Sequence, residues 1–171
     1  NVSNSEAVRH YSQWADVVVL ARELNLEQVK RIHDTIERDG VLGPHGQPVR
    51  IEMFCHGALC MAVSGKCYMS LHEAGASANR GACRQICRRG YVVTDRDTGD
   101  ELAIENQYIM SPKDLKTIHF LNKMMDAGVR VLKIEGRARG PEYVRTVVSC
   151  YNEAVHAIVD GTYSEEKIAA W

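Results

Sequence analysis

The sequence predicts an α/β fold, specifically a fragment of a (β/α)8 TIM-type barrel that carries a cysteine-rich loop and a small β-hairpin insertion. Three short apolar runs, at 15–21, 49–56 and 129–135, alternate with stretches of helical apolar spacing. Such alternation is typical of parallel βαβ units. Three units in 171 residues are fewer than the eight of a complete barrel, which takes about 250 residues. We therefore expect a single partial barrel domain over residues 1–171.

The composition is that of a folded globular domain. Hydrophobic residues make up 45% and charged residues 25% of the chain, and the formal net charge is −1. These values exclude a disordered chain and a strong overall field toward nucleic acid or an anionic membrane. No apolar run approaches the roughly 20 residues of a membrane-spanning helix, and no signal peptide is recognisable, so we expect a cytoplasmic protein with no membrane partner. The chain lacks an initiator methionine and stops at Trp171, so we expect the remainder of the same polypeptide to be missing from it.

The first predicted βα unit has clear boundary signals. Its strand, 15–21, ends in Arg22 and Glu23, and Asn25 then forms a helix N-cap with Gln28 at the third helical position. The apolar residues of this helix keep helical spacing: Leu26, Val29, Ile32 and Ile36.

The second strand opens into an irregular segment. After 49–56, all regular periodicity is lost from 58 to 91, where four cysteines and several arginines occur. We expect a cluster-binding loop with short helical pieces, which needs something other than apolar burial to hold it. A hairpin insertion is predicted at 91–109, with strands at 91–94 and 101–104.

The last third of the chain predicts a helix, a strand and a helix. Ser111 should cap the first helix, with Pro112 at its first position and Gly128 just beyond its end. The inner face of that helix should be Leu115, Ile118, Leu121 and Met125. After the strand at 129–135, the final helix should cover 141–160. Its predicted core stripe is Val144, Val147, Val148, Tyr151, Val155 and Ile158.

Ionisable residues gather at the carboxyl ends of the predicted strands. Alternation places on one face of the second strand Arg50, Glu52, Phe54 and His56, and on one face of the third Val129, Val131, Lys133, Glu135 and Arg137. Barrel enzymes keep their chemistry at this end of the strands. The candidate catalytic residues are therefore Glu52, His56, Lys133, Glu135 and Arg137. The alternative is an ion-pair network that only fixes the barrel, and for His56 a structural hydrogen bond.

Four cysteines form a candidate ligand set, with intervals of six, fifteen and three residues: Cys60, Cys67, Cys83 and Cys87. Four thiolates suit a tetrahedral zinc ion or a cubane iron–sulfur cluster, and the C-x2-C spacing usual for structural zinc is absent. We favour a 4Fe-4S cluster, with zinc and disulfides as the alternatives. Cys55 and Cys150 are expected to be small buried hydrophobic residues.

Basic residues surround the cysteines: Lys66, Arg80, Arg84, Arg88 and Arg89. They could simply offset the negative charge of a thiolate cluster. They could also bind a phosphate backbone, which would give salt-dependent RNA binding although the chain as a whole is nearly neutral. Both interpretations stay open at this point. The sequence has no H-E-x-x-H, G-x-S-x-G or Walker motif, so ordinary protease chemistry has no visible set of residues.

Several sequence blocks closely resemble one known family. The run EMFCHGALCMAVSGKCYMS at 52–70 is similar to the signature of the collagenase-like peptidases, peptidase family U32. Blocks at 79–88, 108–115 and 133–137 are similar to later blocks of the same family. The resemblance covers nearly the whole chain from Leu20 onward.

The resemblance implies a barrel with an oxygen-sensitive four-iron cluster. The better understood members of the family hydroxylate C5 of a pyrimidine in transfer or ribosomal RNA, with prephenate as an implied co-substrate, and relatives hydroxylate the ubiquinone ring without molecular oxygen. Cys83, Cys87 and the arginines around them make this sequence resemble the RNA-modifying branch. The alternatives are a peptidase, as the family name has it, and a non-catalytic module in which a metal staples the loop and the basic residues recruit a partner.

Overall fold

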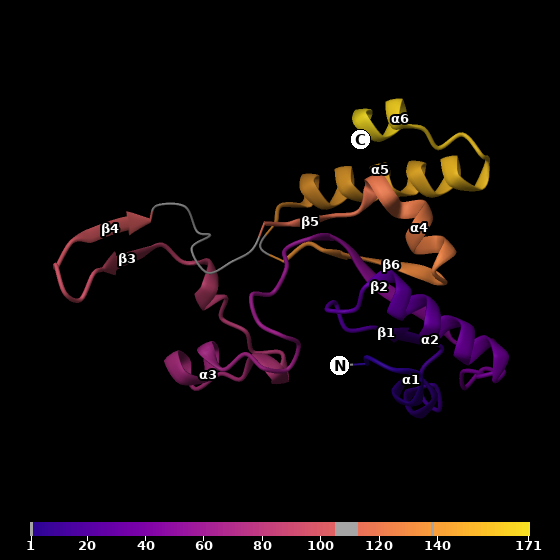
Figure 1. Cartoon of the computed structure of the whole chain (residues 1–171), viewed down its shortest axis with the longest axis horizontal. Helices are drawn as coiled ribbons and strands as arrows, with labels where there is room; N and C mark the ends of the chain where they lie inside the picture. The colour runs from indigo at the N-terminus through magenta and orange to yellow at the C-terminus, as the bar shows by residue number, and fades with distance from the viewer. Residues whose placement is uncertain (1, 105–112, 138) are drawn as a thin grey trace. The chain divides into compact units, whose positions relative to one another are not determined.

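The protein was analysed as a computed structural model, which describes residues 2–104, 113–137 and 139–171. Its internal contacts divide the chain into two compact units. Unit 1 comprises Asn1–Gly57 and Leu115–Trp171, and unit 2 comprises Ala58–Asp114. Each unit is described by itself below, with the element labels of Figure 1.

Unit 1 is built on a small sheet with β2 (Arg50–Gly57) at its centre (Figure 1). β1 (Val17–Val19) pairs with the start of β2 in parallel, and β6 (Val129–Glu135) pairs in parallel along its length. β5 (Leu115–Lys116) pairs antiparallel with the last residues of β2. The prediction of a mixed α/β fold with a parallel sheet is thus confirmed, and two of the three predicted strands match β2 and β6 closely.

Helices pack against one face of this sheet. They are α2 (Leu26–Arg38), α4 (Leu121–Asp126) and α5 (Pro141–Val159). The shared core includes Val29, Ile32, Ile36, Ile51, Met53, Cys55, Leu121, Met124, Val147, Tyr151 and Ala154. The residues of β2 that alternate with this set, Glu52 and Phe54, are half-buried. The described part of unit 1 is therefore a sheet with helices on one face and the polar pair Glu52 and Lys133 on the other.

The capping signals of α2 are confirmed. The Asn25 side chain accepts from the Gln28 backbone N–H at 2.9 Å, and the Gln28 side chain accepts from the Asn25 backbone N–H at 2.9 Å. This reciprocal capping box satisfies two N–H groups that the first turn leaves without a helical partner.

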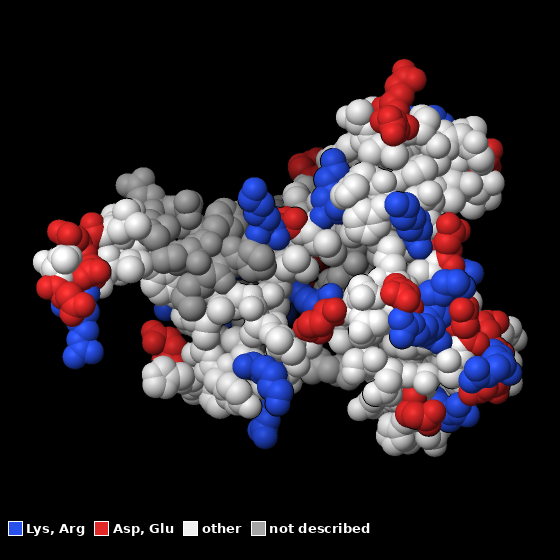
Figure 2. Space-filling view, viewed as in Figure 1, with Lys and Arg blue, Asp and Glu red and all other residues white. Residues whose placement is uncertain are grey.

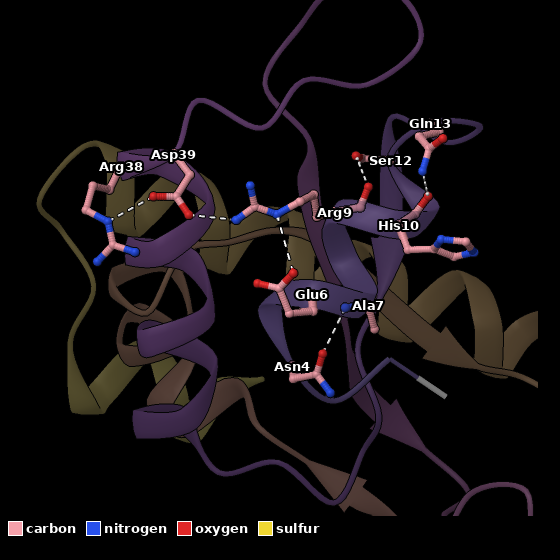
Figure 3. A network of polar contacts seen from close by, with 9 residues as sticks. All are labelled: Asn4, Glu6, Ala7, Arg9, His10, Ser12, Gln13, Arg38 and Asp39. Carbon is pink, nitrogen blue, oxygen red and sulfur yellow. Dashed lines mark hydrogen bonds and ion pairs between the residues drawn. The ribbon is translucent and has the colours of Figure 1, made fainter.

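A short N-terminal helix was not predicted. α1 (Ser5–Tyr11) is capped by Asn4, whose side chain accepts from the Ala7 N–H at 2.8 Å (Figure 3). Arg9 donates to Asp39 at 2.7 Å and so ties α1 to the end of α2. A helix of only seven residues depends on such contacts, because its local propensity alone is too weak to hold it.

The helix predicted to begin at Ser111 is wrong over its first part. Residues 113–117 are not helical, and α4 begins only at Leu121, after the single 3₁₀ turn η3 (Ile118–Phe120). The reason is a long-range contact: the Thr117 N–H and hydroxyl donate to the Cys55 carbonyl at 3.2 and 2.9 Å. These bonds hold the chain extended at the end of β2. Ser111 and Pro112 lie outside the described residues.

The predicted end of α4 is confirmed at Gly128. This residue has φ +96°, and a Cβ built on it would lie 2.0 Å from the His33 ring of α2. Only glycine tolerates this backbone conformation at so close an approach of two helices.

The bounds predicted for the last helix are confirmed, but its core stripe is partly wrong. α5 buries Val147 and Tyr151 as expected, whereas Val148 is 48% exposed and the close contacts are made by Ala154 and Ala157. Apolar residues occupy more of the circumference of this helix than the core contacts. The side that carries the small alanines packs against the core, because small side chains allow the closest approach. The final helix α6 (Glu165–Ala170) was not predicted.

Unit 2 has little apolar core. It contains α3 (Met69–Ala74), the 3₁₀ turns η1 (Ala78–Arg80) and η2 (Ile86–Arg88), and the hairpin β3 (Tyr91–Thr94) and β4 (Glu101–Ile104), whose strands match the prediction. Among its described residues only Ala58, Ser70 and Ile86 are buried. Acidic side chains gather at the hairpin turn (Figure 2). None of the helices in the described ranges has the length and apolar character to cross a lipid bilayer.

Candidate functional site

The other three candidate ligand cysteines of unit 2 all lie close enough to Cys87 to affect its ionisation. Cys60 is exposed, and Cys67, Cys83 and Cys87 are half-buried. Burial raises the pKa of the Cys87 thiol, Arg88 opposes this, and the charges of Cys60, Cys83 and Cys67 each raise the pKa further. A thiolate raises the pKa of another thiol only at short range, so Cys87 lies in the same region of unit 2 as the other three cysteines.

A strained turn directs a backbone donor at one of these sulfurs. Gln85 has φ +53° and is the one non-glycine residue with positive φ in the described ranges. Its N–H donates to the Cys83 Sγ at 3.4 Å. N–H···S bonds of this kind tune the electronic properties of metal-bound thiolates. Backbone strain of about 1–3 kcal/mol is found most often at functional sites.

Two further hydrogen bonds fix the peptide that carries the second cysteine pair. The Arg84 N–H donates to the buried Ser70 hydroxyl at 2.9 Å, and the Arg88 guanidinium donates to the Leu59 carbonyl at 3.2 Å. The second bond joins the residue after Cys87 to the residue before Cys60. The segments that carry the two cysteine pairs are therefore linked by a hydrogen bond from a side chain to the backbone.

The donor set fits a soft metal centre by its chemistry. All six cysteines of the chain are free thiols, and four thiols in a unit with almost no apolar core are the ligands that zinc and iron–sulfur clusters select. Within the described residues, no three His, Cys, Asp or Glu side chains are already arranged as a metal site. A bound centre would therefore have to draw the sulfurs closer together.

The predicted basic residues of unit 2 differ in exposure and in their contacts with the protein. Lys66, Arg80, Arg84 and Arg89 are exposed, whereas Arg88 is half-buried and bonded to Leu59. Arg89 also lies 3.6 Å from the Glu73 carboxylate. The exposed members are available to a phosphate backbone, while Arg88 has a structural bond to maintain.

In unit 1, the structure brings Glu52 and Lys133 together. The Lys133 Nζ donates to Glu52 Oε1 at 2.9 Å, across the neighbouring strands β6 and β2. The Glu52 side chain is 16% exposed and that of Lys133 41%. This pair lies on the sheet face opposite to the helices, as predicted, and can hold charge or a proton beside a bound molecule.

The predicted orientation of His56 is wrong. The pairing of β2 with β6 shifts register between Phe54 and His56, so that His56 pairs with Ile134. Its ring lies 5.5 Å from that of Tyr151 and 5.9 Å from that of Tyr143, both on α5. A bulge of this type moves the following side chain to the other face of the strand. His56 therefore faces α5 and does not share a face with Glu52.

The last two predicted site residues, Glu135 and Arg137, contact each other across a turn. Glu135 Oε1 accepts from the Arg137 backbone N–H at 2.8 Å, and the Arg137 side chain is exposed. Gly57 lies beside this turn with φ +102°, and a Cβ there would lie 2.2 Å from the Glu135 carbonyl oxygen. The carboxyl ends of β2 and β6 thus meet at a distance that only glycine allows.

One residue of this face was not counted among the site candidates. Arg22 follows β1, and its guanidinium carbon lies 4.0 Å from the centre of the Phe54 ring. Lys133 Nζ lies 5.5 Å from the same centre. The available signal was the position of Arg22 directly after a strand, where the other candidates also occur.

A separate cavity of about 830 Å³ lies at the amino ends of the strands, lined by Asp16, His45, Arg50 and Arg130 among others. His45 Nδ1 lies 2.5 Å from the Asp16 carboxylate, and this hydrogen bond lowers the pKa of Asp16. Both the His45 ring and its backbone N–H contact the Asp16 carboxylate, so they join the loop after α2 to the residue before β1. We therefore assign these contacts a structural role.

Comparison with known proteins identifies relatives over the whole chain. It is 74% identical over 171 residues, all of this chain and 41% of the relative, to a protein of Porphyromonas gingivalis named collagenase. It is 41% identical over 84% of its length to the 23S rRNA 5-hydroxycytidine synthase of Escherichia coli, covering 20% of that protein. It is 36% identical over 92% of its length to a tRNA hydroxylation protein of Bacillus subtilis, covering 36% of that protein.

The chain spans less than half the length of these curated relatives. No solved structure matches it. The model of one protein family, described as peptidase family U32, matches residues 1–170. This confirms the resemblance seen in the sequence blocks: the chain belongs to peptidase family U32.

Proposed function

We propose that the protein is an iron–sulfur enzyme that hydroxylates C5 of a pyrimidine in transfer or ribosomal RNA without molecular oxygen. The observation that carries the proposal is the donor set Cys60, Cys67, Cys83 and Cys87, four free thiols in a unit whose described residues have almost no apolar core. A 4Fe-4S cluster would supply both the missing stability and one-electron redox chemistry. Zinc would supply only the stability.

The names of two relatives support the RNA substrate. An rRNA 5-hydroxycytidine synthase and a tRNA hydroxylation protein share 41% and 36% identity with the aligned part of this chain. Exposed Lys66, Arg80 and Arg84 provide positive charge for a phosphate backbone in the unit that carries the cysteines. Because these relatives are named for ribosomal and transfer RNA, we also propose a cytoplasmic location.

The groups of each unit have distinct roles in this proposal. In unit 2, the Gln85 N–H donates to the Cys83 sulfur, and the Arg88 charge opposes the rise in the pKa of Cys87. In unit 1, Glu52 and Lys133 form a polar pair at the sheet face, able to hold a substrate or a co-substrate such as prephenate. The rest of the polypeptide would complete the barrel around that face.

The decisive experiment is mass spectrometry of RNA from a strain that lacks the gene. Complementation with the full-length wild-type gene should restore a pyrimidine 16 Da heavier than in the deletion strain. The Cys83→Ser variant should fail to restore it. The matched Cys150→Ser variant, which alters a half-buried cysteine of α5, should restore it. RNA with unchanged mass in the deletion strain would exclude RNA hydroxylation.

A second candidate function is peptide hydrolysis. One observation favours it: the relative that is 74% identical is named collagenase. If it is correct, purified full-length protein should cleave gelatin, and Glu52→Gln should abolish cleavage because Glu52 is the half-buried carboxylate of the sheet face. Cleavage that persists in Glu52→Gln would point to a contaminating protease.

A further inference from the structure

We propose that the polar sheet face of unit 1 binds an oxyanion, a carboxylate or a phosphate group, with Arg22 as its principal ligand and the Phe54 ring as its support. This site deepens the proposed function, and it rests on that function only in assigning the anion to a substrate. The binding itself needs neither RNA nor turnover, so it can be tested separately.

The backbone before Arg22 is firmly held. The Leu20 N–H donates to the Glu52 carbonyl at 3.0 Å, and the Ala21 N–H donates to the Val2 carbonyl at 2.7 Å. Leu20 and Ala21 are both buried. The starting point of the Arg22 side chain is thus fixed at the carboxyl end of β1, the end at which barrel enzymes bind their ligands.

The Arg22 side chain crosses to the neighbouring strand and lies over Phe54. The guanidinium carbon is 4.0 Å from the ring centre, within the range of a cation–π contact. A guanidinium stacked by its face on a ring keeps its N–H edges in the plane, directed away from the ring. Those edges match the two oxygens of a carboxylate or phosphate. Phe54 therefore orients Arg22 without consuming its hydrogen-bond donors.

The other charged groups of this face already have partners, so Arg22 is the cation that an incoming anion would bind. Lys133 is paired with Glu52 at 2.9 Å. Glu135, the carboxylate at the end of β6, accepts the Arg137 N–H at 2.8 Å. Within the described ranges no carboxylate forms an ion pair with Arg22, which is itself half-buried. A half-buried guanidinium gains most from an anion that arrives with the ligand, because the surrounding protein screens the attraction less than water does.

Lys133 adds a second cation at the edge of the same site. Its Nζ lies 5.5 Å from the Phe54 centre, and Phe54 and Lys133 are direct partners in the β2–β6 register. An oxyanion held by Arg22 beside Phe54 would also feel this ammonium. The contact of Lys133 with Glu52 makes the contribution of Lys133 secondary.

An NMR titration tests the site. The backbone amide shifts of Ala21 and Phe54 are followed in ¹⁵N-labelled protein as inorganic phosphate or malonate is added at constant ionic strength. Saturable shifts with malonate alone would identify a carboxylate site, and with phosphate alone a phosphate site. Arg22→Ala should raise the dissociation constant at least about tenfold, and Arg22→Lys should raise it less.

Two further variants keep the test interpretable. Arg145→Ala removes an exposed arginine of α5 and should leave the dissociation constant unchanged. Phe54→Leu keeps an apolar side chain but removes the ring, and should weaken binding because Arg22 loses its support. Well-dispersed amide spectra establish that each variant is folded. Absence of saturable shifts with either anion, or equal dissociation constants for Arg22→Ala and the wild type, would overturn the proposal.

Discussion

Lys133 and Glu52 form an ion pair of 2.9 Å between adjacent parallel strands, and both side chains project from the sheet face that no core residue of β2 occupies. The Glu52 carboxylate is the more buried partner, with 16% exposure against 41%. Removing Lys133 therefore leaves a poorly solvated negative charge without its partner. The free energy of unfolding should therefore fall more when the lysine alone is replaced than when both groups are replaced together.

We predict that Lys133→Met lowers the free energy of unfolding by about 1–3 kcal/mol, while the double variant Lys133→Met with Glu52→Leu recovers part of that loss. Urea denaturation measures both. Lys30→Met is the matched control, because Lys30 pairs with Asp34 at 3.0 Å on the exposed surface of α2. That change should cost at most about 0.5 kcal/mol. Equal losses at Lys133 and Lys30 would show that the sheet-face pair has no special burial.

Cys55 should make stability depend on pH in the alkaline range. Burial raises the pKa of its thiol from 9.0 to about 12, so the native state keeps the proton after the unfolded state has lost it. The unfolded chain binds fewer protons above pH 9, and stability therefore falls as pH rises between these two values. At pH 10 the loss attributable to Cys55 should be on the order of 1 kcal/mol.

The measurement compares the wild type with Cys55→Ala at pH 8 and pH 10. The variant lacks the titrating group, so its stability should fall less over this interval than that of the wild type, whereas the other titrating groups contribute equally to both proteins. Parallel losses in the two proteins would mean that the Cys55 thiol ionises in the native state as readily as in the unfolded chain.

Gly128→Ala should be strongly destabilising. The substitution meets both a positive φ of +96° and a Cβ position 2.0 Å from the His33 ring. Gly40→Ala is the control, because Gly40 also has positive φ, +59°, but a Cβ there would meet nothing within 4 Å. Thermal unfolding should show a loss of about 1–2 kcal/mol for Gly40→Ala and a clearly larger loss for Gly128→Ala. Similar losses would mean that α2 can move away from the residue at position 128 without a measurable loss of stability.

The basic residues of unit 2 should differ in their effects on RNA binding. Replacement of the exposed Arg80 by alanine should reduce the slope of log affinity against log salt by about one, uniformly across RNA sequences. Arg88→Ala should instead lower the stability of unit 2, because its guanidinium donates to the Leu59 carbonyl at 3.2 Å. Filter binding of tRNA over a salt series, with circular dichroism of each variant, separates these outcomes. An unchanged salt slope in Arg80→Ala would remove that residue from the RNA interface.

The sequence predicted those helices and strands that are specified by residues close together in the chain. The N-cap pair Asn25 and Gln28 and the extents of β2 and β6 are readable within a few residues, and the structure confirms them. The errors arose where a distant contact decides the conformation. Thr117 is held outside α4 because it bonds to Cys55, sixty-two residues earlier in the chain, and no local pattern reveals that bond.

The candidate site shows the same division. The four cysteines could be singled out from the sequence because they are thiols that occur together in a segment without helical or strand periodicity. The position of His56 was not predictable, because the register shift that turns it toward Tyr151 depends on the pairing of β2 with β6. Arg22 required the structure as well, since only the folded sheet brings it over Phe54.

The most direct test of the central claim is the iron and acid-labile sulfide content of anaerobically purified full-length protein. With Cys60, Cys67, Cys83 and Cys87 as ligands of a 4Fe-4S cluster, we expect about four iron atoms and four sulfides per chain, lost in Cys83→Ser and retained in Cys150→Ser. Stoichiometric zinc without sulfide, or a metal content that Cys83→Ser leaves unchanged, would contradict the assignment of these cysteines to an iron–sulfur centre.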